Sequence, residues 1–165
     1  MKDPNPLKHA GKALEQIEKG AFLTVQCGDK VNTMTIGWAT FGVIWHKPVL
    51  MVAVRPTRYT FTLIDNTDNF TVSIPSADMS EELELCGTRS GKECDKFKEF
   101  GLSTNNARKV NSPIIKLAGV HFECRIVFKA VMDPENLVND YEHLYPNKDY
   151  HTLYFGEILE CYEIE

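Results

Sequence analysis

Hydrophobic residues along this chain occur mostly in short blocks of the kind that forms β-strands, and helical spacing is less common. The apolar run at residues 48–54 predicts a buried strand. Residues 69–74 alternate between apolar and polar side chains, which predicts another strand. Residues 8–19 carry Leu14 and Ile17 among charged residues, which predicts a short amphipathic helix.

The remaining segments extend this pattern. We expect further strands at 21–27, 32–44, 119–132 and 151–164. We expect helices at 58–66, 76–85 and 95–100, and loops at 86–92 and 101–113. The segment 133–149 is expected to be an irregular connection that is briefly helical at 134–140. Ser76 is the expected N-cap of the helix that follows it.

Glycines inside the long strands suggest how the sheet is shaped. Gly37 and Gly42 interrupt the strand at 32–44, and Gly156 is expected to break the final strand. Glycine permits sharp corners, so the pattern favours a closed, coiled antiparallel sheet with no regular β-α-β alternation. We therefore predict a mainly β fold with short helices, in a single domain over 1–165 whose segment 1–19 is helical.

Charge and hydropathy exclude several classes of function. Lys and Arg total 18 and Asp and Glu total 23, so the net charge is −5, which argues against non-specific binding of nucleic acid. No stretch approaches the ~18 apolar residues of a membrane span, and the N-terminus has no apolar signal region. The sequence predicts a soluble, cytoplasmic protein.

The cysteines do not suggest a disulfide framework or a metal site. There are five, widely spaced and with no C-x-x-C pair, so no zinc site is expected. Most are expected to be small buried hydrophobes. Cys86 and Cys94 flank a loop that carries glycine and lysine, which leaves a redox role open.

The turn RPTRYT at residues 55–60 joins a predicted strand to a predicted helix and concentrates cationic and hydroxyl side chains. Arg55 and Arg58 offer forked donors that fit a phosphate, and Thr57 and Thr60 add hydroxyl groups. One interpretation is a cradle for a phosphate monoester. The other is a helix N-cap with solvated arginines, and from these residues alone the two remain open.

Five motifs in a fixed order carry a family resemblance. They are NTMTIGW at 32–38, PVLMVAVRPTRYT at 48–60, NFTVSIPS at 69–76, CGTRSGKECDKF at 86–97 and DYHTLYFGEI at 149–158. The series resembles the flavin reductase-like FMN-binding proteins, near the flavoredoxin branch, over about residues 20–162. The resemblance implies a Greek-key-like split β-barrel, assembled as a homodimer, with FMN bound non-covalently near the subunit interface.

The resemblance also implies a set of cofactor-binding residues. They are Asn32, Thr33, Met34, Thr35, Ile36, Trp38, Arg55, Thr57, Arg58, Tyr59, Thr60, Cys86, Ser90 and Lys92. The backbone at 33–35 would read the polar edge of the flavin ring, while Met34, Ile36 and Trp38 offer apolar bulk. Spacing at i, i+2 and i+4 also fits three core side chains, and for Trp38 the core interpretation is favoured.

The loop GTRSGK at 87–92 is not a nucleoside-triphosphate loop, because its glycines are too close and Glu93 follows the lysine. It resembles the SGK loop of the family, in which Ser90 and Lys92 would lie near the flavin. A mobile, solvated loop is the alternative.

His151 is the candidate catalytic residue, because it lies in the DYHTLYFGEI motif. In the family the histidine at this place faces the flavin and the nicotinamide, and a neutral imidazole can donate a hydrogen bond there. A lone histidine on a strand is more often structural, so the catalytic role depends on the resemblance.

Three functions are compatible with these features. The first is an NAD(P)H-dependent FMN oxidoreductase that passes electrons to free flavin, ferric iron or a protein acceptor. The second is a flavoredoxin-type electron carrier with no NAD(P)H activity of its own, since Thr35 to Trp38 departs from the Thr-Ala-Asn-Ser motif of two-component reductases. The third is an FMN-binding module.

Overall fold

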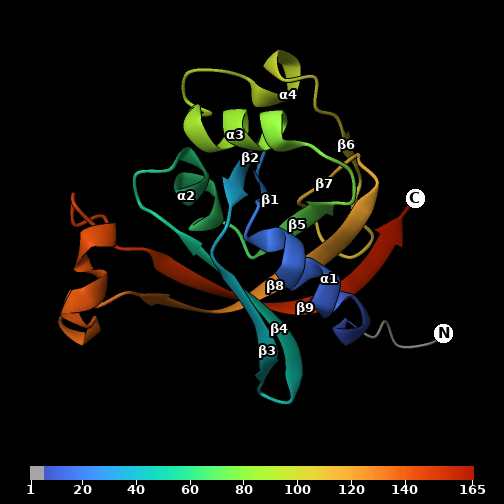
Figure 1. The fold of residues 1–165 in the computed structure, drawn as a ribbon. Helices are drawn as coiled ribbons and strands as arrows, with labels where there is room; N and C mark the ends of the chain where they lie inside the picture. The colour runs from blue at the N-terminus through green and yellow to red at the C-terminus, as the bar shows by residue number, and fades with distance from the viewer. Residues whose placement is uncertain (1–5) are drawn as a thin grey trace.

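Seven antiparallel strands form the main sheet in the computed structural model, which describes residues 6–165 (Figure 1). The strands are β1 (Ala21–Cys27), β2 (Lys30–Ile36), β3 (Ala39–Ile44), β4 (Lys47–Val54), β5 (Asn69–Pro75), β8 (Gly119–Val131) and β9 (Thr152–Ile164). The short strands β6 (Thr104–Asn105) and β7 (Ile114–Ile115) pair with each other. The α-helices are α1 (Leu7–Ile17), α2 (Tyr59–Ile64), α3 (Ser80–Thr88) and α4 (Lys96–Glu99), and the 3-10 helices are η1 (Pro134–Asn136) and η2 (Asn139–Leu144).

The sheet order is β2-β1-β5-β8-β9-β4-β3, so the two edge strands are consecutive in the chain. Only Gly37 and Trp38 separate β2 from β3, and the carbonyl of Trp38 accepts a bond from the Ala53 N–H at 3.4 Å. The sheet therefore curls until its two edges are joined by these residues. This confirms the predicted mainly β, antiparallel fold, and it confirms the interruption expected at Gly37, because β2 ends at Ile36 and β3 begins at Ala39. The interruption expected at Gly42 is wrong. Gly42 lies inside β3 without interrupting it.

The long strands β8 and β9 cross the centre of the molecule (Figure 1). Gly156 does not break β9. It lets the core pack closely, because a Cβ there would lie 2.6 Å from Phe70 Cζ and 2.7 Å from Cys124 Cβ. β8 has two register shifts against β9, one of them between Ile126 and Phe128. Phe128 is consequently exposed, whereas Cys124 is buried.

The helices depart from the sequence pattern at their ends. α3 begins at Ser80, whose N–H donates to the carboxylate of Asp78 at 3.0 Å. Ser76, the expected N-cap, donates to the carbonyl of Ala118 instead. α3 continues to Thr88, so the loop expected from residue 86 starts three residues later. In α1 the buried side chains include Ala13 and Ile17, whereas Leu14 is exposed.

The main core lies between the sheet and helices α1 and α2, with Phe70 and Phe122 among its fully buried side chains. A second cluster under α3 includes Phe22 and Leu83. Helices α2 and α3 both contact β2, the edge strand (Figure 1). The first five residues of the expected helical segment 1–19 lie outside the described residues.

Candidate functional site

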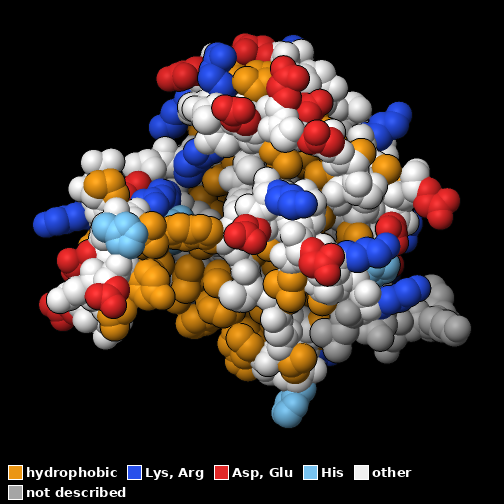
Figure 2. All heavy atoms as spheres, viewed as in Figure 1, with side chains coloured by type: hydrophobic (Ala, Val, Ile, Leu, Met, Phe, Trp, Pro, Cys, Tyr) orange, Lys and Arg blue, Asp and Glu red, His pale blue; other side chains and the backbone are white. Residues whose placement is uncertain are grey.

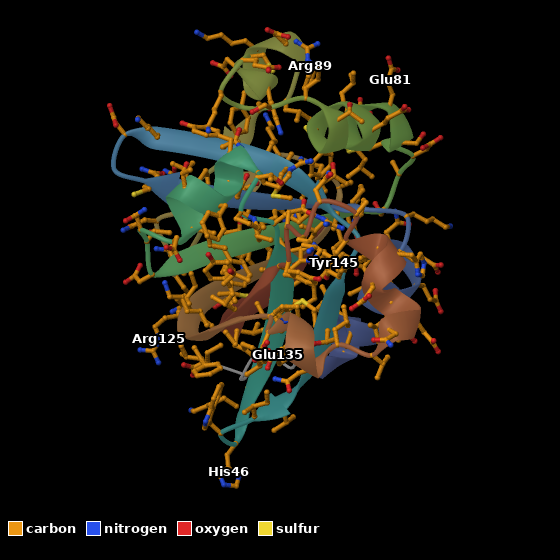
Figure 3. The ribbon with its side chains drawn as sticks, turned by 90° about the vertical axis from the view of Figure 1, so that its left-hand side faces the viewer. His46, Glu81, Arg89, Arg125, Glu135 and Tyr145 are labelled. Atoms are coloured by element: carbon orange, nitrogen blue, oxygen red, sulfur yellow. The ribbon has the colours of Figure 1, made fainter. Side chains whose placement is uncertain are left out.

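Two hollows on the α2–α3 side of β2 share Met34 and Arg58 in their walls, so they adjoin each other, and the pair is called the groove here. The first, of about 250 Å³, is called here the cationic lobe and is lined by Asn32, Met34, Thr57, Arg58, Tyr59, Thr60, Thr88, Arg89, Ser90, Gly91 and Lys96. The second, of about 220 Å³, is the aromatic lobe and is lined by Met34, Thr35, Ile36, Gly37, Trp38, Ala53, Arg55, Arg58 and His151. Figure 3 labels Arg89, which lines the cationic lobe, and Tyr145, which contacts His151 of the aromatic lobe.

Arg58 lies between the two lobes, at the N-cap position of α2. Its guanidinium donates to the carbonyls of Gly87 (2.6 Å) and Cys86 (3.3 Å) on α3. Burial lowers the pKa of Arg58 from its ordinary value. Within residues 6–165 no carboxylate lies within ion-pair distance of it. Two of its five N–H groups are used by the carbonyls, so the others are available to an anion.

Hydroxyl groups surround this cation. Thr60 is fully buried, and its oxygen accepts a bond from the side-chain amide of Asn32 at 2.8 Å. The Thr60 proton therefore remains available as a donor. Gly91 closes the wall of the lobe, since a Cβ there would lie 2.3 Å from Asn32 Oδ1 and 2.5 Å from Tyr59 Cδ1.

Lys96, at the start of α4, is a second cation of the cationic lobe, and its side chain is buried. The ammonium donates to the carbonyls of Thr33 (2.9 Å) and Cys86 (2.8 Å). Burial, with a smaller contribution from the positive charge of Arg58, lowers the pKa of Lys96 from 10.5 to about 8. No carboxylate among the described residues pairs with it.

His151 and Trp38 face each other in the aromatic lobe, with ring centroids 4.9 Å apart. His151 Nδ1 lies 2.7 Å from the Tyr145 hydroxyl. Burial, and then the positive charge of Arg55, lower the pKa of His151 from 6.5 to about 4. The imidazole is therefore neutral at neutral pH and serves as a hydrogen-bonding group.

Arg55 lies in the aromatic lobe, away from the hydroxyl groups around Arg58. It pairs with Asp149 at 2.8 Å, donates to the Leu144 carbonyl at 2.9 Å, and stacks over the Tyr145 ring at 4.7 Å. These partners occupy the guanidinium N–H groups of Arg55 that a phosphate would need. The two arginines of the RPTRYT turn thus serve different parts of the groove.

Most of the residues expected at a site line this groove. They are Asn32, Met34, Thr35, Ile36, Trp38, Arg55, Thr57, Arg58, Tyr59, Thr60, Ser90 and His151. The core interpretation of Trp38 is wrong, because its side chain is 45% exposed and lies beyond the end of β2. Met34 and Ile36 are buried, as a core role requires, and also line the groove.

Three expected residues do not line the groove. The Thr33 hydroxyl bonds to Thr24 and to the Leu23 carbonyl in the interior of the sheet. Cys86 is buried and burial raises the pKa of its thiol to about 11, so its contribution is the carbonyl that holds Arg58 and Lys96. Lys92 lines an adjacent hollow instead.

Six lining residues were missed by the sequence analysis: Gly37, Ala53, Thr88, Arg89, Gly91 and Lys96. Five of them lie inside the motifs at 32–38, 48–60 and 86–97, so the sequence pointed to their segments without marking the residues themselves: Gly37, Ala53, Thr88, Arg89 and Gly91. Lys96 also lies inside the 86–97 motif, but a lysine in a charged segment is usually solvated, so nothing in the sequence marked this side chain as buried.

Other kinds of site find no support among residues 6–165. They contain no group of three or more His, Cys, Asp or Glu side chains placed to hold a metal ion. The five cysteines are free. No helix in this part of the chain has the length and apolar character of a membrane span.

The chain is similar to a known protein family and to proteins of other organisms. Residues 19–165 match the family described as flavin reductase like domain. An uncharacterised protein of Pyrococcus abyssi is 33% identical over 135 residues, which cover 80% of this chain and 66% of that protein.

Solved structures share the fold. The flavoredoxin of Methanosarcina acetivorans superimposes with a TM-score of 0.69 at 25% identity, covering 88% of this chain and 68% of that one. An FMN-binding protein of Thermus thermophilus with bound p-hydroxybenzaldehyde gives a TM-score of 0.70 at 21% identity, covering 88% of this chain and 71% of that one. The match over residues 19–165 establishes that this chain belongs to the flavin reductase-like domain family.

Proposed function

We propose that the chain binds FMN in the groove formed by the two lobes and acts as an FMN oxidoreductase that takes electrons from NADH or NADPH. The observation that carries this proposal is the cationic lobe. Arg58 and Lys96 are two buried or half-buried cations without a carboxylate partner among residues 6–165, in a chain whose net charge is −5. Unpaired buried cations are costly, so they are expected where an anion binds.

The side chains of the cationic lobe fit a phosphate dianion. Arg58 retains free N–H donors, and Thr57, Thr60 and Ser90 line the same hollow. The Thr57 hydroxyl also donates to the carboxylate of Asp149 at 3.5 Å. Charge-assisted hydrogen bonds from such a set are short and strong. The combined groove is of a size typical for ligand pockets, which occupy about 300–1,000 Å³.

The aromatic lobe fits a flat, partly apolar ring. Met34 and Ile36 supply apolar surface, and Trp38 supplies an exposed aromatic face. β2 is an edge strand, so one side of its backbone has no strand partner and is available to polar atoms of a ligand. Bound here, FMN would supply the hydride and single-electron chemistry that the protein side chains lack.

His151 is the residue we assign to the substrate side of this site. Its pKa of about 4 keeps it neutral, so its role is to hydrogen-bond and orient a bound molecule without adding charge. Tyr145 fixes the ring through Nδ1, which directs the remaining polar atom, Nε2, to other partners.

The physiological electron acceptor in this proposal is free flavin, ferric iron or a protein. A flavoredoxin-type carrier without NAD(P)H activity is the second candidate, favoured by the similarity to the Methanosarcina flavoredoxin. An FMN-binding module is the third. Cytoplasmic location stays a prediction.

We further propose that the protein is a homodimer. Exposed apolar side chains gather where the β3–β4 hairpin approaches β8, and Trp45, Phe128 and Phe155 contact one another there. Figure 2 shows a broad apolar surface between the 3-10 helices and this hairpin, whose tip carries His46 in Figure 3. Surfaces of this kind mark protein–protein contacts.

Anaerobic stopped-flow mixing tests the redox assignment. The FMN-loaded protein is mixed with NADH or with NADPH, and the flavin absorbance is followed. Bleaching within seconds by either nucleotide supports the oxidoreductase. If neither nucleotide bleaches the flavin while dithionite does, the carrier is the correct assignment.

A further inference from the structure

Lys96 has an environment that differs from that of the other lysine of α4, Lys98. Its side chain is 2% exposed, although α4 is short and its neighbour Lys98 is fully solvated. The ammonium ties the Thr33 carbonyl on the free edge of β2 to the Cys86 carbonyl on α3. Lys96 therefore connects two of the walls of the cationic lobe.

The charge on this ammonium is poorly compensated. Its two partners are neutral carbonyls, and Cys86 O is shared with the Arg58 guanidinium, so two cations meet at one oxygen. An ammonium has three N–H donors, and the structure gives partners for two. Lys96 also lines both the cationic lobe and the hollow next to it, so its third donor is close to solvent-accessible space.

The titratable and charged groups that face Lys96 are few. They are Arg58 at the start of α2, Cys86 on α3 and Cys94 in the segment before α4. Arg58 favours loss of the lysine proton. A phosphate dianion in the cationic lobe has the opposite effect, because a negative charge nearby stabilises the ammonium.

We propose that Lys96 is a proton-linked positioning residue: an anionic phosphate in the cationic lobe drives uptake of a proton by Lys96, and the resulting ammonium locks β2 to α3 around the ligand. The proton comes from the buffer, and the amine becomes the ammonium without any other bond changing. The inference rests on the proposed function, because FMN is the phosphate ester that we place in this lobe.

Linkage gives the direction and size of the effect. The pKa of Lys96 is about 8 in the ligand-free protein, so a fraction of the chains have lost the proton at pH 8 and above. If the bound phosphate raises this pKa by about one unit, the dissociation constant for FMN rises about sixfold between pH 7.5 and 9.5, and a larger rise in pKa gives a larger change. The phosphate of FMN is already a dianion in this range, because its second pKa is about 6.

Isothermal titration calorimetry of FMN binding at pH 8.2, in Tris and in HEPES, measures the proton count directly. For the wild type we expect uptake of a substantial fraction of a proton per FMN. Lys96→Met should abolish the uptake and make FMN affinity independent of pH between 7.5 and 9.5. Lys98→Met, on the same helix but exposed, is the matched control and should behave as wild type. Cys94→Ser serves as a second control, because Cys94 is one of the groups that face Lys96.

A measurement without FMN keeps the inference about Lys96 separate from the proposed function. The NMR titration of the lysine side-chain Cε–Hε signals, with and without inorganic phosphate, reports the Lys96 pKa itself. We expect phosphate to raise it and Lys96→Met to remove the signal. FMN binding to the wild type with no proton uptake, and a Lys96 pKa unchanged by phosphate, overturn the inference but leave the proposed function intact. Failure of FMN to bind at all, with a phosphate-sensitive Lys96, overturns the proposed function instead.

Discussion

The Arg55 guanidinium is paired with the Asp149 carboxylate, 94 residues further along the chain, with 2.8 Å between Nη1 and Oδ1. Arg55 also donates to the carbonyl of Leu144 at the end of η2. The ion pair therefore fastens the excursion between β8 and β9 against the end of β4. His151 follows Asp149 by two residues, so the same contact helps to place the imidazole in the aromatic lobe.

Arg55→Gln should mainly destabilise the fold. The substitution leaves Asp149, which is 15% exposed at its side chain, without its cation, and we expect a loss of about 1–3 kcal/mol in the free energy of unfolding. Urea denaturation of the ligand-free protein measures it. A double-mutant cycle with Asp149→Asn isolates the pair. No coupling between the two substitutions would contradict the structural role.

His151→Gln should slow reduction of bound FMN by NAD(P)H more than it weakens FMN binding, since a misplaced hydride donor is costly to the rate. With a pKa of about 4, His151 should also impose no step on the reduction rate between pH 6 and 9. Single-turnover rates across this range test both points. A reduction rate that changes with pH around a midpoint near 6.5 would contradict the prediction that His151 stays neutral in this range.

The same histidine predicts an effect of pH on stability. Its pKa is lower in the folded protein than the ordinary 6.5, so the unfolded chain binds more protons between pH 6.5 and 4. Stability should therefore decrease as the pH falls through this window, and His151→Gln should reduce that decrease. His121 is fully buried and its pKa is also lowered by burial, so part of the acid sensitivity will remain. Melting temperatures at pH 4.5 and 7.5 measure the difference; equal acid sensitivity in wild type and variant would contradict the assignment.

Local patterns predicted the strands well because each depends on its own residues. β1 runs over the expected 21–27, and β5 ends one residue after the expected 69–74. Departures arise where distant residues decide the conformation. Gly156 was expected to break β9, yet Phe70 and Cys124 pack against it, and that packing is invisible in the order of the sequence.

Local motifs also pointed to most of the residues that line the groove, but they did not show the contacts between residues that are distant in the sequence. Arg55 and Arg58 are three residues apart, and the motif alone does not distinguish their roles. Only the fold reveals that Asp149 engages Arg55, whereas Arg58 stays without a carboxylate within residues 6–165. Lys96 and Lys98 both belong to the short helix α4, and the sequence does not show which of them is buried. In the structure, the ammonium of Lys96 donates to a carbonyl on β2 and a carbonyl on α3.

Gly91→Ala should damage the cationic lobe. The added methyl group would overlap Asn32 and Tyr59, and Asn32 is held in place by Thr60. We expect FMN affinity to fall about tenfold, which corresponds to roughly 1.4 kcal/mol. Gly42→Ala, where nothing lies within 4 Å of the new Cβ, is the matched control. Fluorescence quenching of FMN compares the two; equal affinities would mean that this wall does not contact the ligand.

Phe128→Glu should convert the proposed homodimer to a monomer, because the charge would be placed in the apolar cluster with Trp45 and Phe155. Leu14→Glu, at an exposed position on α1, is the control and should leave the assembly unchanged. Sedimentation equilibrium determines the mass of each. A wild-type protein that is monomeric at high concentration would refute the dimer.

The measurement that tests the central claim most directly is calorimetric titration of the ligand-free protein with FMN, for the wild type and for Arg58→Gln. We predict one FMN per chain for the wild type. Arg58→Gln should weaken binding about tenfold to a hundredfold, since a charge-assisted contact contributes about 1.5–3 kcal/mol. Arg125→Gln, which removes an exposed arginine outside the groove, should bind as the wild type does. Absence of FMN binding by the wild type, or equal affinity in the Arg58 variant, would contradict the claim that the cationic lobe holds the flavin phosphate.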